Sequence, residues 1–417
     1  MYNQKIIKVF EHESLRLGQQ GFNQNHWTAL IKLNELHGDK YFRIIHNGVR
    51  FKEYVGVVQI DDLTIEILPK IDKDLNADWQ KVLIRMLQVC RKLSPDANNE
   101  ANVNKQNISL IDLYFELFLK EVNKLIRLGL TKKYRKETGN VKALKGKLEF
   151  AGHLSKNLIH KERFYTSHSV YDTDHLLHQV ISEALNVVEQ LSKGTYISDK
   201  CKRTKLSFPD VSRIRVKQSL FDRIQLNRKT KPYEKAIELA RLILLNYSPD
   251  IEGGKEKMLA LLFDMNTLWE EYVLRVLQRA SKGFDGMKVI GQAQKKFWEN
   301  RRVKPDIVIT HKNNDTDETI VIDTKWKRLT NNRADIADLR QMYVYNKYWD
   351  AKKSLLLYPK GNKYKENVSG RFYTDGKNTP DDNNTCEIGY LDIIEGENLS
   401  NDWGVKFLEE LTNPVTI

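Results

Sequence analysis

Two apolar segments, each interrupted by an aspartate, flank a short polar stretch near residue 315 and constrain the C-terminal part of the chain. They are Val303–Thr310, VKPDIVIT, and Thr319–Lys325, TIVIDTK, with HKNNDTDE between them. Strand-like segments so close in sequence are typical of an antiparallel hairpin. If the pairing is centred on the polar stretch, Asp306 lies opposite Asp323, because both are equally far from its middle.

This hairpin predicts a metal-dependent hydrolytic centre. Opposed carboxylates repel unless a cation lies between them, and Mg²⁺, or Mn²⁺ in its place, binds carboxylates together with water and phosphate oxygens. Lys325 lies two residues beyond Asp323 on the same strand face, where an ammonium can stabilise charge on a reacting phosphate. We therefore predict phosphodiester hydrolysis at Asp306, Asp323 and Lys325. The alternative is an ordinary surface hairpin with an Asp–Lys ion pair.

A helix is predicted directly before the hairpin, in MNTLWEEYVLRVLQRA, because apolar residues recur there at three- and four-residue spacing. Glu270 projects from the edge of the apolar stripe, whereas Glu271 projects from the polar face. Glu270 is therefore a candidate additional metal ligand, together with Asp306 and Asp323. The alternative is that Glu270 only forms a salt bridge at the helix boundary.

A second helix is predicted after the hairpin, in NNRADIADLRQMYVYNKYW. Gln341 and Tyr345 are four residues apart and therefore share one helix face. Their amide and phenol can bind a DNA phosphate or orient Lys325, and we predict that both residues support the site. A Gln–Tyr pair at this spacing also arises by chance.

The N-terminal region alternates β-branched and aromatic residues with polar ones from Tyr41 to Ile71. Turn sequences at Asn47-Gly48 and Asp61-Asp62 predict an antiparallel meander. The period then changes to that of an amphipathic helix between Trp79 and Cys90. A polar stretch, Ser94–Gln106, follows this helix.

The middle of the chain carries most of the excess positive charge. After a predicted helix at Leu110–Leu130, Thr131–Tyr165 contains ten Lys or Arg against three Glu, and Lys200–Pro232 contains eleven against two Asp. Each segment is either a solvated helical surface or a track that contacts duplex phosphates. A Pro- and Gly-containing stretch, Ser248–Gly254, predicts a boundary after this region.

Together these patterns predict an α+β protein of 417 residues with three parts. Residues 1–105 are expected to form a β-rich N-terminal domain and residues 106–254 a basic helical middle region. Residues 255–417 are expected to form an α/β domain with a mixed sheet.

Composition restricts the environment and the partners of this protein. A net charge of +13 favours a polyanionic partner such as double-stranded DNA. No apolar stretch approaches the roughly 20 residues that span a membrane, and the residues MYNQKIIKVFEHESL lack the apolar segment and cleavage site of a secretory signal. The three cysteines, Cys90, Cys201 and Cys386, have no metal-binding spacing. We expect buried thiols in a cytoplasmic protein.

Beyond the hairpin, the order of Glu helix, Pro-Asp strand, Asp-x-Lys strand and Gln-x-x-x-Tyr helix resembles PD-(D/E)xK nucleases. From Val55 to Tyr345 the chain resembles McrC, the endonuclease subunit family of McrBC restriction systems. The segments that carry this resemblance are GVVQIDDLTIEILPKID, LKGKLEFAGHLSKNL, YDTDHLLHQVISEAL and FDMNTLWEEYV. Two residues depart from the common patterns: Asp323 replaces the Glu of the wider superfamily, and Trp269 stands where Phe is usual.

The resemblance implies an Mg²⁺-dependent DNA endonuclease subunit of a GTP-dependent restriction complex that responds to modified DNA, of the 5-methylcytosine type. It assigns metal binding to Asp306 and Asp323, catalysis to Lys325, and accessory roles to Glu270 and the Gln341–Tyr345 pair. It also implies an McrB-like AAA+ hexamer whose GTPase the N-terminal domain stimulates. No GxxxxGK[ST] motif occurs in the sequence, so GTP is expected only on the partner.

Two other functions stay open from the sequence. The chain is alternatively a regulatory adaptor of an AAA+ motor with a vestigial nuclease centre, or a stand-alone DNA repair nuclease.

Overall fold

The structure of the protein is a computed structural model. The structure describes residues 5–70, 78–90, 109–248, 258–313, 316–327, 329, 333–361, 366–373, 378–396, 398–400 and 402–412. Within these residues, no helix has both the length and the apolar character needed to cross a membrane. All three cysteines are free and buried, as predicted.

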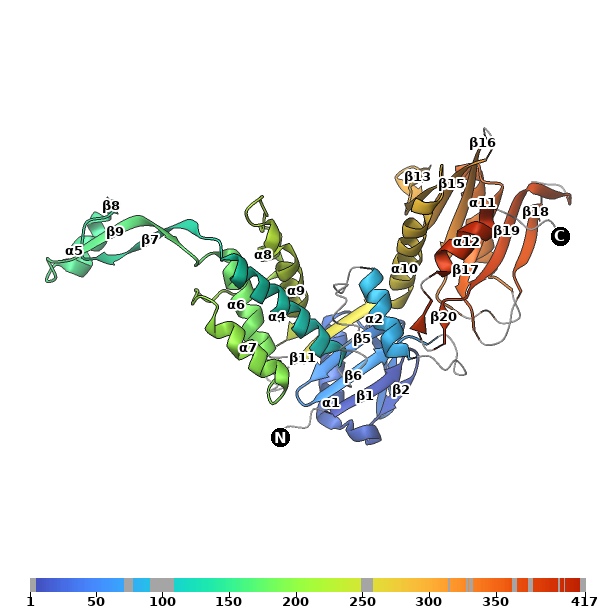
Figure 1. The fold of residues 1–417 in the computed structure, drawn as a ribbon. Coiled ribbons are helices and arrows are strands. Elements are labelled where there is room, and N and C mark those ends of the chain that lie inside the picture. The colour runs from blue at the N-terminus through green and yellow to red at the C-terminus, as the bar shows by residue number, and fades with distance from the viewer. Residues whose placement is uncertain are drawn as a thin grey trace. The chain divides into compact units, whose positions relative to one another are not determined.

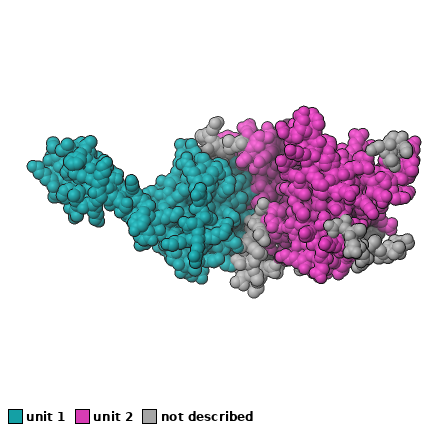
Figure 2. Space-filling view, turned by 90° about the horizontal axis from the view of Figure 1, so that it is seen from above, with its two compact units in different colours: residues 1–5, 59–64, 111–261 teal, residues 6–58, 65–110, 262–417 magenta. Residues whose placement is uncertain are grey.

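The chain divides into two compact units, coloured separately in Figure 2. Unit 1 contains residues 1–5, 59–64 and 111–261, and unit 2 contains residues 6–58, 65–110 and 262–417. Unit 2 therefore combines N-terminal and C-terminal parts of the sequence. These compact units do not test the three domains predicted from the sequence, and that division stays a prediction.

The N-terminal strands form two sheets. One has the order β1-β6-β5-β11-β10 and the other the order β2-β4-β3. The strands and helices of this region are β1 (Lys5–Phe10), β2 (Ser14–Arg16), η1 (Gln19–Gly21), α1 (Gln24–Leu36), β3 (Phe42–Ile45), β4 (Gly48–Phe51), β5 (Tyr54–Ile60), β6 (Leu63–Leu68), α2 (Trp79–Val89), β10 (Tyr247–Ser248) and β11 (Met258–Asp264).

The predicted hairpin at Asn47-Gly48 is confirmed, because β3 and β4 pair antiparallel with Ile45 opposite Gly48. The predicted single meander is wrong, since β5 and β6 lie in the other sheet. The reason is burial. Every residue of β6, and every residue of β5 after Tyr54, is buried, which is typical of strands covered on both faces rather than of a half-exposed meander.

The helices predicted on either side of the polar stretch are confirmed. Helix α2 buries its apolar residues as expected, and helix α4 (Leu110–Leu128) ends at Gly129, whose φ of 88° favours glycine. The polar stretch Ser94–Gln106 lies outside the described residues. So does the predicted boundary Ser248–Gly254, apart from Ser248.

Unit 1 combines helices with an extended β-ribbon (Figure 1). The ribbon extends away from the helices and carries a short helix near its far end. Besides α4, the elements of this part of the chain are β7 (Lys133–Val141), β8 (Lys147–Leu148), α5 (Phe150–Asn157), β9 (Phe164–Asp172), α6 (Leu176–Leu191), α7 (Tyr196–Leu206), α8 (Gln218–Phe221), η2 (Lys231–Tyr233) and α9 (Glu234–Leu245).

The ribbon corrects the expectation that the basic segment Thr131–Tyr165 is helical. Strand β9 pairs with both β7 and β8, and no residue of β7 is buried. Because both faces of β7 meet solvent, the strand lacks the apolar–polar alternation by which strands are recognised in a sequence. The α+β class is nevertheless confirmed.

The C-terminal part of unit 2 is built on a mixed sheet of order β12-β15-β16-β17-β19-β18. Its central pairs, β16–β17 and β17–β19, are parallel, and the others are antiparallel. The elements here are α10 (Met265–Ala280), η3 (Ser281–Gly283), β12 (Lys288–Gly291), β13 (Lys295–Trp298), β14 (Arg301–Val303), β15 (Ile307–Asn313), β16 (Thr316–Thr324), α11 (Ile336–Trp349), β17 (Lys353–Pro359), β18 (Val368–Tyr373), β19 (Pro380–Leu391), β20 (Ile394–Glu395), β21 (Asn398–Leu399) and α12 (Trp403–Thr412).

Helix α11 covers one face of this sheet. Met342, Tyr345 and Trp349 of the helix share a buried cluster with Val308 of β15 and Val321 of β16. Side chains alternate between the two faces of a strand, so Asp323 lies on the same face as Val321, toward α11.

Candidate active site

The β15–β16 hairpin has the register predicted from the sequence. Ile307 pairs with Ile322 and Val308 with Val321. One step further along this register, Asp306 just before β15 comes opposite Asp323 near the end of β16. The predicted juxtaposition of the two aspartates is confirmed. The strands also extend further into the polar stretch than expected, to Asn313 and from Thr316.

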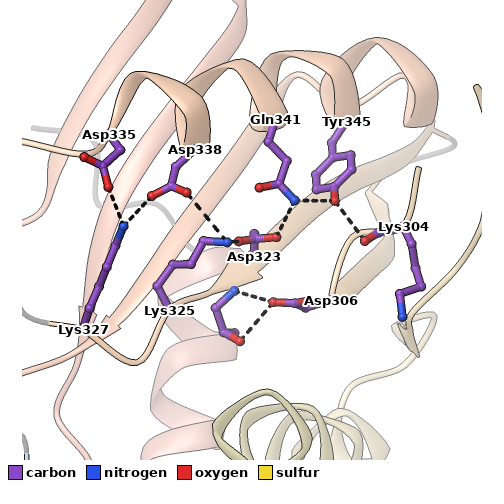
Figure 3. A network of polar contacts seen from close by, with 10 residues as sticks. Lys304, Asp306, Asp323, Lys325, Lys327, Asp335, Asp338, Gln341 and Tyr345 are labelled. Atoms are coloured by element: carbon purple, nitrogen blue, oxygen red, sulfur yellow. Dashed lines mark hydrogen bonds and ion pairs between the residues drawn. The ribbon is translucent and has the colours of Figure 1, made fainter. Parts of the chain in front are cut away.

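Asp323 is almost fully buried, at 2% exposed. Its Oδ2 lies 2.6 Å from the Lys325 ammonium, and its Oδ1 accepts a hydrogen bond of 3.3 Å from the Gln341 amide (Figure 3). Asp323 is therefore held between Lys325, which directly follows strand β16, and Gln341 of helix α11.

Asp306 is fixed by a different partner. Its Oδ2 accepts hydrogen bonds from the Thr324 backbone N–H at 2.7 Å and from the Thr324 hydroxyl at 3.1 Å. Burial raises the pKa of Asp306, and the nearby Glu270 carboxylate raises it further. Burial likewise raises the pKa of Asp323, with Asp306 acting in the same direction. The centre thus concentrates negative charge in a poorly solvated place.

Lys325 connects the aspartates to a second group of charges. Its Nζ lies 3.8 Å from Asp338 of α11, and Asp338 also binds Lys327 at 2.8 Å. Burial acts to lower the pKa of Lys325, but Asp323 and Asp338 outweigh it, so that the pKa lies above its usual range. Lys327 in turn binds the exposed Asp335 at 2.7 Å. Lys325 is therefore held in its charged form.

Gln341 and Tyr345 form one hydrogen-bonded chain, as Figure 3 shows. The Gln341 amide donates to the Tyr345 hydroxyl at 2.7 Å, and this hydroxyl donates to the Lys304 carbonyl at 2.9 Å. Gln341 binds Asp323 rather than Lys325 itself, and whether the pair orients Lys325 or binds a DNA phosphate stays a prediction. Asp338, one helical turn earlier, contacts Lys325 instead, since residues three apart share a helix face.

Glu270 lies on α10, the helix predicted before the hairpin. It is half-buried, and its pKa is raised first by burial and then by the charge of Asp323. Glu271 behaves differently, since it binds Arg275 at 3.3 Å one turn along the helix. Glu270 is the glutamate whose charge acts on the aspartate pair, and its role as a metal ligand stays a prediction. Glu271 is half-buried and does not face solvent as predicted.

The residues present fit a hard divalent cation that keeps water in its coordination shell. Among the described residues, no group of three or more His, Cys, Asp or Glu side chains is arranged so that it could hold a metal ion. The two aspartates supply carboxylate oxygens, and their mutual repulsion is relieved by a cation. Mg²⁺ is typically bound through one or two carboxylates, with waters and phosphate oxygens completing its shell.

Sequence reasoning missed two residues of the site. Asp338 had a signal, because it lies three residues before Gln341 on one helix face. Thr324 had none, because its contact with Asp306 depends on the strand ending at this residue.

The fold and this centre define a class: an α+β protein whose mixed sheet presents paired aspartates and a lysine to a Gln-x-x-x-Tyr helix. Residues 49–359 match the family described as McrBC 5-methylcytosine restriction system component. The chain belongs to this family, which confirms the relationship predicted from the sequence.

Solved structures show the same fold. A chain of the refined half-complex from the tetradecameric assembly of Thermococcus gammatolerans McrB AAA+ hexamers with bound McrC is similar, with a TM-score of 0.70 and 20% identity. The match covers 97% of this chain and 100% of that one. In the cryo-EM structure of the Thermococcus gammatolerans McrBC complex, a second match has a TM-score of 0.51 and 22% identity, covering 66% of this chain and 88% of that one. A search of curated proteins found no match.

Proposed function

We propose that this McrBC family member is an Mg²⁺-dependent DNA endonuclease. The observation that carries the proposal is the pairing of Asp306 with Asp323 at the open end of a hairpin, with the Lys325 ammonium 2.6 Å from Asp323. An ordinary surface ion pair does not explain why a buried and a half-buried carboxylate, both with raised pKa values, lie side by side.

In this proposal each residue has a distinct role. Asp306 and Asp323 would hold Mg²⁺, with Glu270 as an additional acid, and the bound ion would polarise a phosphoryl oxygen and acidify water. Lys325 neutralises charge on the scissile phosphate or positions the attacking water. Gln341 and Tyr345 fix the carboxylate of Asp323.

The chain is further proposed to work with a partner. The Thermococcus gammatolerans structures contain McrB AAA+ hexamers with bound McrC, and this chain covers the whole length of the first matched chain. We infer a cytoplasmic complex with an McrB-like, GTP-hydrolysing AAA+ hexamer that responds to modified cytosine in double-stranded DNA. Residues 1–105 are proposed to dock on the hexamer and stimulate its GTPase.

The test is cleavage of methylated and unmethylated plasmid in Mg²⁺, with and without the partner and GTP. We expect cleavage only with both, abolished in Asp323→Asn and reduced in Glu270→Gln. Glu271→Gln is the matched control on the same helix turn and should retain activity. Cleavage by the chain alone would favour the stand-alone nuclease, and GTPase stimulation without any cleavage would favour the adaptor.

A further inference from the structure

A buried carboxylate of the N-terminal region reaches the segment that carries Lys325. Glu11 follows strand β1 and is 4% exposed. Its Oε1 accepts hydrogen bonds from the Lys70 backbone N–H at 2.9 Å and from the Trp326 indole N–H at 2.7 Å. One oxygen atom thus joins Lys70, the last residue of the ILPK segment (Ile67–Lys70), to Trp326, the residue after Lys325. All three residues belong to unit 2.

The indole of Trp326 is packed as well as hydrogen-bonded. Its ring centroid lies 5.3 Å from that of Trp269, and both side chains are buried. Trp269 directly precedes Glu270, and Trp326 directly follows Lys325. The two indoles therefore connect the chain positions that present these two candidate site residues.

The backbone on the other side of the lysine is also fixed. The Lys325 N–H donates to the Leu357 carbonyl at 2.9 Å, which ties residue 325 to strand β17. Beyond β16 the chain leaves the sheet, so the Glu11–Trp326 hydrogen bond fixes it where strand pairing no longer does. Lys325 thus lies between two anchored positions.

This arrangement is costly, which argues against a merely structural role. Among the described residues, Glu11 Oε2 receives no hydrogen bond, and it lies 3.9 Å from the exposed His12 ring. Burial raises the pKa of Glu11 to about 7, although the Lys70 and Trp326 hydrogen bonds oppose this shift. Buried polar atoms are nearly always satisfied, so an exception calls for an explanation.

We propose that Glu11 is a positioning residue for the nuclease centre: by holding Trp326 it fixes the orientation of Lys325, and it makes the ILPK segment part of the active centre. This inference rests on the proposed endonuclease function. It adds Glu11 to the residues of the site, although Glu11 is more than 300 positions from Trp326 in sequence. Glu11 acts through Trp326 and not by direct contact with Asp306, Asp323 or Lys325.

The test compares variants in the complete complex with partner, GTP, Mg²⁺ and saturating DNA. Glu11→Ala and Trp326→Phe should each lower kcat about tenfold, as loss of a residue that supports an active-site ligand typically does, with KM for DNA unchanged. The double variant should be no slower than either single one, because both remove one hydrogen bond. Glu11→Gln retains an acceptor oxygen and should restore most of the activity.

The matched control is Glu13→Ala. Glu13 is half-exposed and binds the Lys70 ammonium at 3.3 Å, and its loss should leave kcat unchanged. Thermal unfolding and GTPase stimulation of each variant report whether the fold is intact. The proposal is wrong if the losses in kcat of the two single variants multiply in the double variant, or if Glu11→Gln is as slow as Glu11→Ala.

A second readout separates this inference from the proposed function. The indole N–H resonance of Trp326, assigned through Trp326→Phe, should shift in Glu11→Ala and not in Glu13→Ala, whether or not the complex cuts DNA. If wild type does not cut, the endonuclease proposal fails. An unmoved resonance would instead show that Glu11 does not hold Trp326.

Discussion

At the scale of single residues, Asp323 is subject to two opposing effects. The Lys325 ammonium stabilises its ionised form, whereas burial and the Asp306 carboxylate destabilise it. Its pKa is raised, so the destabilising effects are larger. A carboxyl whose pKa is raised by folding contributes stability at low pH, and this contribution is lost as pH rises through the folded pKa. Above that pH the ionised aspartate costs stability unless a cation binds.

Asp323→Asn should therefore stabilise the metal-free protein while abolishing cleavage. In EDTA at pH 8 we expect the free energy of unfolding to rise by up to about 3 kcal/mol, because folding raises the pKa of Asp323 from 3.8 to about 6 and each unit corresponds to about 1.4 kcal/mol. In wild type, Mg²⁺ at 100 times its Kd should add about 2.7 kcal/mol. The variant should lose this gain. Thermal unfolding with EDTA or Mg²⁺ measures both effects, and an equal Mg²⁺ response in the variant would contradict metal binding at Asp323.

Asp338 offers a second prediction, because it holds Lys325 and Lys327 together. Asp338→Asn should lower kcat for cleavage about tenfold with little change in DNA affinity, since Lys325 loses one of its two carboxylate partners. Asp335→Asn is the matched control, because among the described residues the Asp335 carboxylate pairs with Lys327 and not with Lys325, and its side chain is 72% exposed. Equal losses in both variants would show that charge alone, rather than the contact with Lys325, matters.

The centre itself was predictable because its information is local. Asp306 and Asp323 are placed by hairpin register, and Lys325 by strand alternation, both of which follow from sequence spacing. Glu11 was not predictable. Its partner is more than 300 residues away, and no periodic pattern connects distant segments of a chain.

At the scale of elements, the base of the β7–β9 ribbon is fixed by a buried network. Tyr233 accepts a hydrogen bond from the Thr131 N–H at 3.0 Å, and its hydroxyl lies 2.8 Å from His178 Nε2. His178 Nδ1 lies 2.6 Å from the Thr173 carbonyl, so the ring donates there and accepts from Tyr233. Thr131 and Thr173 flank the two ribbon strands, and the neutral imidazole therefore joins both strand ends to the helices.

This network predicts a loss of stability in acid. Burial lowers the pKa of His178 to about 4, with His175 acting in the same direction and Thr173 opposing it. A base with a depressed folded pKa stabilises the fold above its ordinary pKa, and this stability is lost as pH falls from about 6.5 to 4. The loss should reach at most about 3 kcal/mol.

Chemical unfolding of unit 1 at pH 7 and pH 4.5 measures this loss. His178→Gln should reduce the difference between the two pH values, whereas His160→Gln, at an exposed histidine of the same ribbon, should leave it unchanged. A wild-type pH dependence retained in His178→Gln would assign the acid sensitivity to other groups.

Elements were predictable where burial is one-sided. Helices α2, α4 and α10 each bury a single stripe, and their predicted bounds are close to the observed ones. The wrong predictions concern strands whose two faces are equally buried or equally exposed. Strand β6 is buried on both faces and β7 on neither, so the apolar pattern shows neither the sheet to which β6 belongs nor that β7 is a strand.

At the scale of the whole molecule, unit 2 is assembled from separate parts of the sequence, and this determines which fragments can fold. The Met265 N–H donates to the Glu53 carbonyl at 2.8 Å, and Cys90 contacts the Leu268 carbonyl through its thiol at 3.7 Å. With the Glu11–Trp326 hydrogen bond, these contacts tie helix α10 and the hairpin segment to the N-terminal region. Sequence periodicity assigns residues 255–417 to a domain without showing these contacts.

We therefore predict that residues 255–417 alone do not form a stable domain. Without residues 6–58 and 65–110, the fragment exposes Trp269, Trp326 and the apolar face of α10 to water, and burial of a large aromatic side chain contributes about 2–3 kcal/mol. Native domains are stable by only about 5–15 kcal/mol, so this loss is large. Co-expression with residues 1–110 should restore the buried contacts. Amide NMR spectra and thermal unfolding of the fragment, with and without its complement, test this. A dispersed spectrum and an unchanged melting temperature for the isolated fragment would show that residues 255–417 fold independently of the N-terminal strands.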